Sequence, residues 1–79
     1  TSMKGERAIV CGPEIAPGTH RGFVQVRAHG AALPATYSYD SGFLSAQLDE
    51  PLLGLATGQA MVVYDEDRVV ASATICETA

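Results

Sequence analysis

Residues 23–29 read Phe-Val-Gln-Val-Arg-Ala-His, an alternation of apolar and polar side chains that decides the fold class. Successive side chains of an extended strand point to opposite faces. The apolar face of this segment carries Val24, Val26 and Ala28, and the polar face carries Gln25, Arg27 and His29. The pattern predicts a half-buried β-strand, and its polar row is the exposed surface of greatest functional interest.

The same two-residue alternation recurs in two later segments. Their apolar rows are Leu44, Ala46 and Leu48 in the first, and Val69, Ala71, Ala73 and Ile75 in the second. Shorter strand candidates are residues 7–11, 35–39 and 59–64, and the last is apolar on both faces, as expected of a central strand. Together these segments predict six strands.

Turn-forming residues separate the predicted strands. The connections Asp40-Ser41-Gly42 and Asp65-Glu66-Asp67 are so short that their flanking strands must form antiparallel hairpins. Residues 43–56 are interrupted by Pro51 and Gly54, so we expect at most one helical turn near residues 52–55. Six strands without a helix favour a small antiparallel β-barrel, closed or nearly closed, over residues 7–76. Residues 1–6 are then expected to be a linker or an expression remnant on a piece of a longer parent, and residues 77–79 a C-terminal tail.

Size and charge restrict the function. The chain has 79 residues, a length that allows one domain and is too short for a buried enzyme cleft. Its net charge at pH 7 is −4. Residues 1–39 contain four basic and two acidic residues, whereas residues 40–79 contain one basic and seven acidic residues. Domains that bind a phosphate backbone on their own are normally basic. The composition excludes a strong autonomous nucleic-acid binder and leaves room for one or two contacts from the N-terminal half.

Two cysteines, Cys11 and Cys76, are too few for the disulfide framework of a small secreted domain. We therefore expect no disulfide and a reducing, cytoplasmic location. Neither these cysteines nor His20 and His29 have the spacing of a zinc site, so no metal is expected. No apolar run is long enough to span a membrane, and the N-terminus lacks a signal segment.

No catalytic motif is present: the sequence has no G-x-S-x-G, no glycine-rich phosphate loop and no H-E-x-x-H. Asp49-Glu50 looks like a carboxylate pair, but adjacent strand residues point to opposite faces, which favours a solvated pair over an acid–base couple. The acidic run Asp65-Glu66-Asp67 is most simply a solvated hairpin tip. We therefore assign no catalytic residue.

Four segments carry a family resemblance by their order and spacing. They are Val26-Arg27-Ala28-His29-Gly30, Leu48-Asp49-Glu50-Pro51, the run Thr57-Gly58-Gln59-Ala60-Met61-Val62-Val63-Tyr64, and residues 69–75. Over roughly residues 7–76 they resemble the C-terminal domain of the tRNA-specific 2-thiouridylases (tRNA-uridine 2-sulfurtransferases). That family typically reads V-x-x-R-Y-R, F-D-E-P, T-P-G-Q-x-x-V-F-Y and a glycine-rich final strand. This sequence departs from it at Ala28, where Tyr is common, at His29, where Arg is common, at Thr57, where Pro is usual, and at Ala71-Ser72-Ala73, which replaces the glycine run.

The resemblance implies a parent enzyme that replaces the 2-oxygen of the wobble uridine of tRNA with sulfur. It would use ATP, with Mg, in an N-terminal domain and a protein persulfide as sulfur donor. The family's catalytic cysteines precede this region, so Cys11 and Cys76 are not expected to carry sulfur, and no cofactor is expected within this chain.

The barrel itself is implied to be noncatalytic, to pack on the N-terminal and central domains of the same enzyme, and to contact tRNA. The family's tRNA contacts correspond to Arg27, Ala28 and Gln59 in this sequence, and Gln25 and His29 are additional RNA-facing candidates. Two alternatives remain open: a barrel of the translation-factor type, since the second domain of elongation GTPases has the same general shape, and a plain protein-interaction domain without an RNA role.

Overall fold

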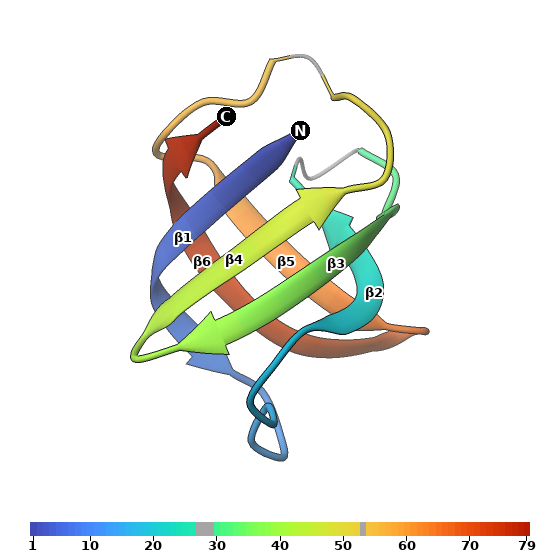
Figure 1. Ribbon diagram of the computed structural model, residues 1–79, viewed down its shortest axis with the longest axis vertical. Coiled ribbons are helices and arrows are strands. Elements are labelled where there is room, and N and C mark those ends of the chain that lie inside the picture. Colours follow the sequence, from blue (N-terminus) through green and yellow to red (C-terminus); the bar gives the residue numbers. More distant parts are fainter. Residues whose placement is uncertain (27–29, 53) are drawn as a thin grey trace.

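Six β-strands make up the regular secondary structure of the described residues, 1–26, 30–52 and 54–79 of a computed structural model (Figure 1). They are β1 (Ser2–Val10), β2 (His20–Gln25), β3 (Leu33–Asp40), β4 (Phe43–Leu48), β5 (Ala60–Asp65) and β6 (Arg68–Thr78). They form a closed antiparallel barrel in the order β1-β4-β3-β2-β5-β6. The predicted all-β class and six-stranded antiparallel barrel are therefore confirmed. Within the described residues, no helix has the length and apolar character needed to cross a membrane.

Both predicted hairpins are present. Asp40 pairs with Phe43 across the turn between β3 and β4, and Asp65 pairs with Arg68 across the turn between β5 and β6. Each turn begins with a residue of positive φ, Ser41 at 51° and Glu66 at 57°. Such values match the right-handed twist of the strands that a two-residue loop must join.

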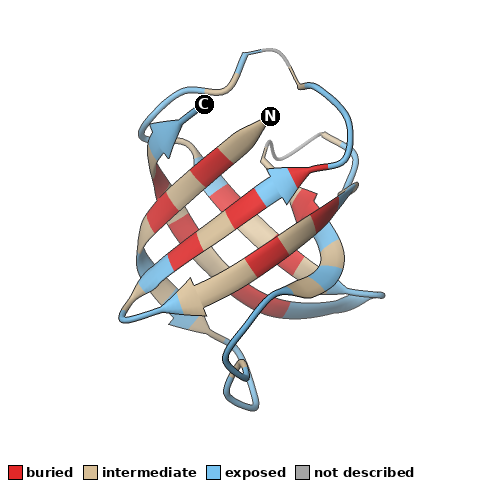
Figure 2. Cartoon of the chain, viewed as in Figure 1, coloured by how far each residue is buried: buried red, intermediate tan, exposed pale blue. Residues whose placement is uncertain are grey.

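The core fills the barrel interior with the alternating side chains of all six strands (Figure 2). The predicted inward row of β4, Leu44, Ala46 and Leu48, is buried as expected. The largest fully buried side chains are Leu44, Met61, Ile75, Val24 and Val63. Burial of apolar area at roughly 25 cal/mol per Å² is the main force that holds this barrel together.

The first strand is longer than the sequence predicted. Strand β1 begins at Ser2, so residues 2–6 belong to the barrel and are not a linker, and β6 continues to Thr78, so most of the expected tail is also strand. Met3 and Gly5 point inward. A Cβ on Gly5 would lie 2.6 Å from the Cβ of Ala73, so glycine is required by close strand packing. A glycine inside a strand weakens the apolar alternation, which is why the pattern missed this segment.

The inward row of β6 contains one correction. Ala71, Ala73 and Ile75 are buried as predicted, but Val69 is exposed and Val70 is buried instead. The pairing with β5 shifts between Val63 and Tyr64, which face Ala71 and Val69 respectively and leave Val70 as an extra residue. A β-bulge of this kind reverses the facing of the residues before it.

The barrel has two distinct ends (Figure 1). The end that holds both termini also holds the C-terminal end of β2 and the described parts of the connection from β4 to β5, residues 49–52 and 54–59; we call it the termini end. The opposite end holds the 11–19 connection and the turns after β3 and β5; we call it the hairpin end.

Candidate nucleic-acid interface

The predicted RNA-facing residues divide into two groups. Arg27, Ala28 and His29 lie outside the described residues. Gln25 and Gln59 are described, and both lie at the termini end, because Gln25 is the last residue of β2, where it pairs with Val62 of β5, and Gln59 immediately precedes β5. The structure therefore brings these two candidates to the same end of the barrel.

Gln25 connects the barrel wall to the chain that follows β2. Its Nε2 donates to the backbone carbonyl of Gly30 at 2.6 Å, and its Oε1 accepts a hydrogen bond from the Tyr64 hydroxyl at 2.9 Å. The side chain is half-buried. Gln25 was predicted to lie on an exposed polar row; its side chain amide also makes contacts inside the molecule and holds Gly30 against the barrel.

Gln59 closes a turn with one half of its amide. Its Oε1 accepts a hydrogen bond from the backbone N–H of Ala56 at 3.0 Å. Its backbone carbonyl accepts from the N–H of Ile75 at 2.7 Å, and the carbonyl of Ile75 in turn accepts from the N–H of Gly58 at 2.8 Å. No partner of Nε2 is found among the described residues, so this end of the side chain can donate to an oxygen outside the chain.

Arg21 and Asp49 form an ion pair that the sequence analysis did not identify. The Arg21 guanidinium donates to both carboxylate oxygens of Asp49, at 2.7 and 2.6 Å, and to the hydroxyl of Thr36 at 3.0 Å. The hydrogen bond from Arg21 lowers the pKa of the Asp49 carboxyl, and the same bond raises the pKa of Arg21. Asp49 is the first of the two acidic residues in the Leu48-Asp49-Glu50-Pro51 motif, so this motif is anchored to β2 through one of its carboxylates.

The 49–59 connection is therefore fixed near both of its ends and at one point between them. Asp49, its first residue, is fixed by the ion pair of its side chain with Arg21, and its backbone N–H donates to the carbonyl of Pro34 at 3.0 Å. The N–H of Leu52 donates to the Thr1 hydroxyl at 3.1 Å. Gln59 holds the last turn. A connection with these anchors presents Gln59 in a defined position, which a binding contact requires.

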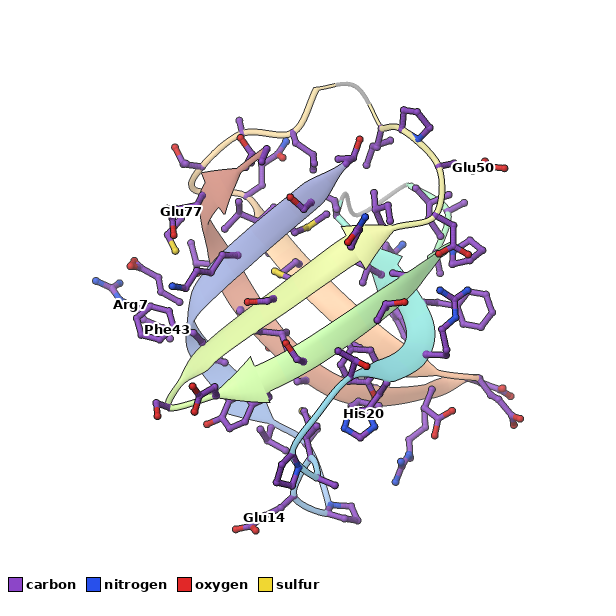
Figure 3. All side chains as sticks on the ribbon, viewed as in Figure 1. Arg7, Glu14, His20, Phe43, Glu50 and Glu77 are labelled. Carbon is purple, nitrogen blue, oxygen red and sulfur yellow. The ribbon has the colours of Figure 1, made fainter. Side chains whose placement is uncertain are left out.

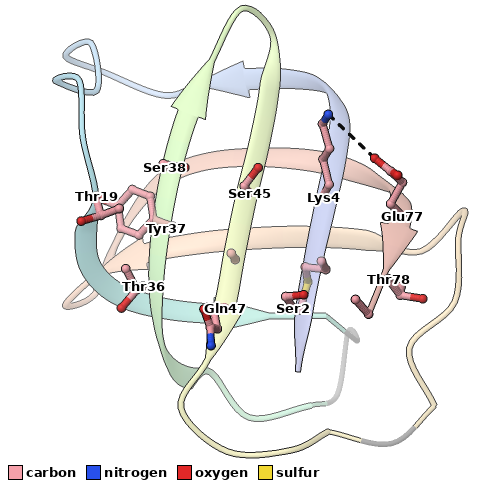
Figure 4. Close-up of a pocket in the computed structure, with 13 residues that line it drawn as sticks. Ser2, Lys4, Thr19, Thr36, Tyr37, Ser38, Ser45, Gln47, Glu77 and Thr78 are labelled. Carbon is pink, nitrogen blue, oxygen red and sulfur yellow. Dashed lines mark ion pairs between the residues drawn. The ribbon is translucent and has the colours of Figure 1, made fainter.

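Polar side chains cover the outer side of β1, β4 and β3. They surround a shallow hollow of about 430 Å³ in which Ser2, Ser38, Ser45, Thr36 and Gln47 take part (Figure 4). Lys4 lies at its margin, 3.8 Å from a carboxylate oxygen of Glu77 and 4.5 Å from the centroid of the Phe43 ring. This ion pair and the cation–π contact both engage the one lysine of the hollow.

Few cations are available for phosphate on the described surface. Lys4, Arg21 and Arg68 each lie within 4 Å of a carboxylate, and Arg7 is the described Lys or Arg side chain without an ion pair. Arg7 points into solvent on the same side as Phe43 (Figure 3).

The hairpin end is acidic. Asp65, Glu66 and Asp67 form its turn, next to Arg68, which lies 3.7 Å from Asp65. Tyr37 packs against the His20 ring at a centroid distance of 5.4 Å, and burial, followed by the charge of Asp65, raises the pKa of Tyr37. Among the described residues, no group of three or more His, Cys, Asp or Glu side chains could hold a metal ion. The acidic turn and the two candidate glutamines lie at opposite ends of β5.

Comparison with known families defines the class of domain. The family model described as the aminomethyltransferase beta-barrel domain matches residues 1–75. The chain therefore belongs to this family of small β-barrel domains.

Named relatives narrow the comparison. The tRNA-specific 2-thiouridylase MnmA of Cutibacterium acnes is 47% identical over 72 residues, which are 91% of this chain and 19% of the relative. The protein of the same name from Beutenbergia cavernae is 57% identical over 60 residues, 70% of this chain and 16% of the relative. The one from Acidothermus cellulolyticus is 41% identical over 78 residues, 99% of this chain and 21% of the relative. The resemblance stated from the sequence is confirmed, and the chain spans about a fifth of the length of these relatives.

Proposed function

We propose that this chain is the noncatalytic C-terminal barrel of an ATP-dependent tRNA 2-thiouridylase, and that it packs on the catalytic part and helps to position tRNA. The observation that carries the proposal is the 41–57% identity to proteins named tRNA-specific 2-thiouridylase MnmA over most of this chain. The reaction of the parent would be 2-thiolation of the wobble uridine with a persulfide sulfur donor, in the cytoplasm.

The positioning role rests on a small set of contacts. Arg27, Ala28 and Gln59 are the proposed tRNA-binding residues, with Gln25 and His29 as further candidates. Gln59 offers its Nε2 donor at the termini end, from a turn that its own Oε1 stabilises. Donors of this kind bind phosphate or ribose oxygens and fix the orientation of a nucleic acid without reading its sequence. The net charge of −4 agrees with an auxiliary role, because most of the attraction for tRNA must then come from the catalytic part.

ATP and Mg are assigned to the catalytic part of the parent. Phosphate cradles of this kind use a glycine-rich loop at the N-terminus of a helix. The described residues of this chain form strands and connections without such a loop, so they do not fit the nucleotide. Within this proposal, the residues of the barrel bind and orient tRNA and take no part in bond breaking.

The tRNA contact is tested with Gln59→Glu in the full-length parent. A carboxylate keeps an acceptor oxygen for the Ala56 N–H, so the turn is retained, while the Nε2 donor is replaced by a negative charge. We expect weaker tRNA binding at low salt with an unchanged unfolding temperature. Gln47→Glu is the matched control, since it makes the same charge change on the exposed outer side of β4.

A second pair of variants tests Arg27. Arg27→Ala should weaken tRNA binding and reduce the slope of log K against log salt by about one unit or less, as expected for one lost phosphate contact. Arg68→Ala removes the same charge from the acidic hairpin end and should change neither quantity. If Arg27→Ala and Gln59→Glu both bind tRNA as the wild type does, the barrel is not part of the tRNA interface.

A further inference from the structure

The outer surface of the barrel is divided into a polar and an apolar side. The strand pairing aligns one row of outward side chains across four strands: Pro34 of β3, Phe23 of β2, Tyr64 of β5 and Val69 of β6. Phe23 and Val69 keep 38% and 37% of their surface exposed. Side chains at paired positions on one face lie next to each other, so this row forms a continuous apolar band.

The adjacent row enlarges the band. Val62 of β5 pairs with Gln25 of β2 on one side and with Ser72 of β6 on the other. Ser72 in turn pairs with Ile9 of β1, whose side chain is 64% exposed. The hydrogen bond from the Tyr64 hydroxyl to Gln25 holds the Tyr64 ring beside these residues. We call the set of Ile9, Phe23, Pro34, Val62, Tyr64 and Val69 the apolar face. The corresponding positions on β1, β4 and β3 are Ser2, Lys4, Ser45, Gln47, Thr36 and Ser38. The exception on this mostly polar side is Phe43 at the start of β4, which is 41% exposed and lies against Lys4.

We propose that the apolar face is the surface with which the barrel docks on the catalytic part of its own polypeptide. The inference rests on the proposed function, because it requires a longer parent. Relatives are about five times as long as this chain, so most of the residues available to cover the face would be covalently tethered to it. Tethering raises the effective concentration to the millimolar range, at which a modest apolar contact is sufficient.

The area of the apolar face is consistent with docking on a tethered part of the same polypeptide. A stable contact between separate proteins covers about 800 Å² on each partner, which is about a sixth of the 4785 Å² accessible surface of the barrel. Six side chains, several of them already half-buried, supply less than such an area. An intramolecular contact needs less area than an association between two free copies, so tethered docking explains the face better than a homodimer.

Charge argues against RNA on this face. Asp65, Glu66 and Asp67 follow directly on Tyr64 and border the face at the hairpin end. Three carboxylates beside Arg68 repel a phosphate backbone, whereas the basic surface that a tRNA-binding catalytic part must have would complement them. Gln59 is not among the residues of the apolar face, so docking through this face does not require this proposed tRNA contact to be covered.

The experiment measures thiol accessibility in the full-length parent. Cys11 and Cys76 are replaced by Ser, and a single reporter cysteine is introduced as Val69→Cys or Phe23→Cys on the apolar face, or as Gln47→Cys on the polar side. Alkylation rates are followed by mass spectrometry of the reporter peptide, at nanomolar protein without tRNA, and are normalised to the denatured chain. Two reporters on the face guard against a local effect of either substitution.

Docking predicts that both reporters on the apolar face react about tenfold or more slowly than Gln47→Cys, because only the minor undocked population is open to reagent. Equal rates at the three positions would overturn the proposal. Protection that appears only when tRNA is added would overturn it in favour of an RNA surface, and protection that is lost on dilution would overturn it in favour of self-association. The alkylation rates require neither tRNA binding nor turnover. The docking proposal can therefore be wrong while the proposed function is right, and the proposed function can be wrong while docking is observed.

Discussion

Arg21 and Asp49 are 28 positions apart in the sequence, yet their side chains meet in two parallel hydrogen bonds of 2.7 and 2.6 Å. Strand β3 lies between them: Arg21 pairs with Thr36 across β2 and β3, and the N–H of Asp49 donates to Pro34 of the same strand. The forked geometry of Arg matches a carboxylate in this way, and Lys could not replace it. The pair fixes the point at which the 49–59 connection leaves the barrel.

The first prediction concerns acid stability. The pKa of Asp49 is lowered in the folded state, so its stabilising contribution is complete above the ordinary carboxyl value of 3.8 and is lost as the pH falls through the lower folded value. Asp49→Asn should lower the unfolding temperature at neutral pH, and the difference from wild type should vanish in strong acid. Thermal unfolding from pH 2 to 7 at low salt measures this. Glu50→Gln, which changes the neighbouring carboxylate, is the control, and an Asp49→Asn difference that is constant over the whole range would contradict the pairing.

The second prediction concerns the contact between Gly5 and Ala73. Gly5→Ala should destabilise the barrel by about 1–3 kcal/mol, because the new Cβ would lie 2.6 Å from the Cβ of Ala73. In an Ala73→Gly background the same change should cost clearly less, which a double-mutant cycle by urea unfolding would detect. Ala71→Gly removes a buried methyl group from the same strand without opening this contact, so it should give no rescue. Additive effects of Gly5→Ala and Ala73→Gly would rule out the predicted clash.

The third prediction concerns the turn between β5 and β6. Glu66 has a φ of 57°, a region that costs a residue with a Cβ about 1 kcal/mol, whereas Asp67 does not have a positive φ. Glu66→Gly should therefore stabilise the barrel by about 0.5 kcal/mol, and Asp67→Gly should destabilise it by a similar amount. Each variant removes one negative charge from the same turn, so differences in calorimetric unfolding temperature report backbone conformation. Equal effects of the two variants would show that charge alone determines them.

The fourth prediction concerns the cysteines. Cys11 is exposed and Cys76 is half-buried, and both are free thiols. Replacing both by Ser in the full-length parent should leave tRNA thiolation largely intact, and the purified 79-residue chain should form no AMP from ATP. A variant that folds normally but no longer thiolates tRNA would assign a chemical role to one of these thiols.

Sequence periodicity predicted the fold because most of the inward positions are apolar and alternate without interruption, as in β4. The prediction from periodicity was wrong where a β-bulge or an interior glycine interrupted the two-residue alternation. At Val69 and Val70, an extra residue in the bulge exchanged the exposed and buried side chains. In β1, the inward-facing Gly5 interrupts the apolar alternation, and this position requires glycine because a Cβ would lie 2.6 Å from the Cβ of Ala73.

The candidate site was predictable only in part. Gln25 and Gln59 were identified by strand alternation and by family resemblance. The bond of Gln25 to Tyr64 depends on the pairing of β2 with β5, whereas the bond of Gln59 to Ala56 closes a local turn that strand alternation does not describe. The Arg21–Asp49 pair depends on β3 lying between the two residues, which follows from the strand order and not from any local pattern. An outward Arg on β2, an outward Thr on β3 and an Asp directly after β4 were the available signal.

Strand β1 precedes the other strands of the barrel in the sequence, yet its neighbours are β4 and β6. It pairs with neither β2 nor β3, and the last link of its ladder joins Met3 to Thr78. While the barrel folds, β1 can therefore complete neither of its two ladders until β4 and β6, which lie further along the sequence, are available to pair with it. Closure of the barrel joins its first strand to its last. Contacts between segments so far apart in the sequence form slowly, and strands that are still unpaired can aggregate in the meantime. The seam between β1 and β6 is therefore the contact that closes the barrel, and without β6 the other five strands would form an open sheet.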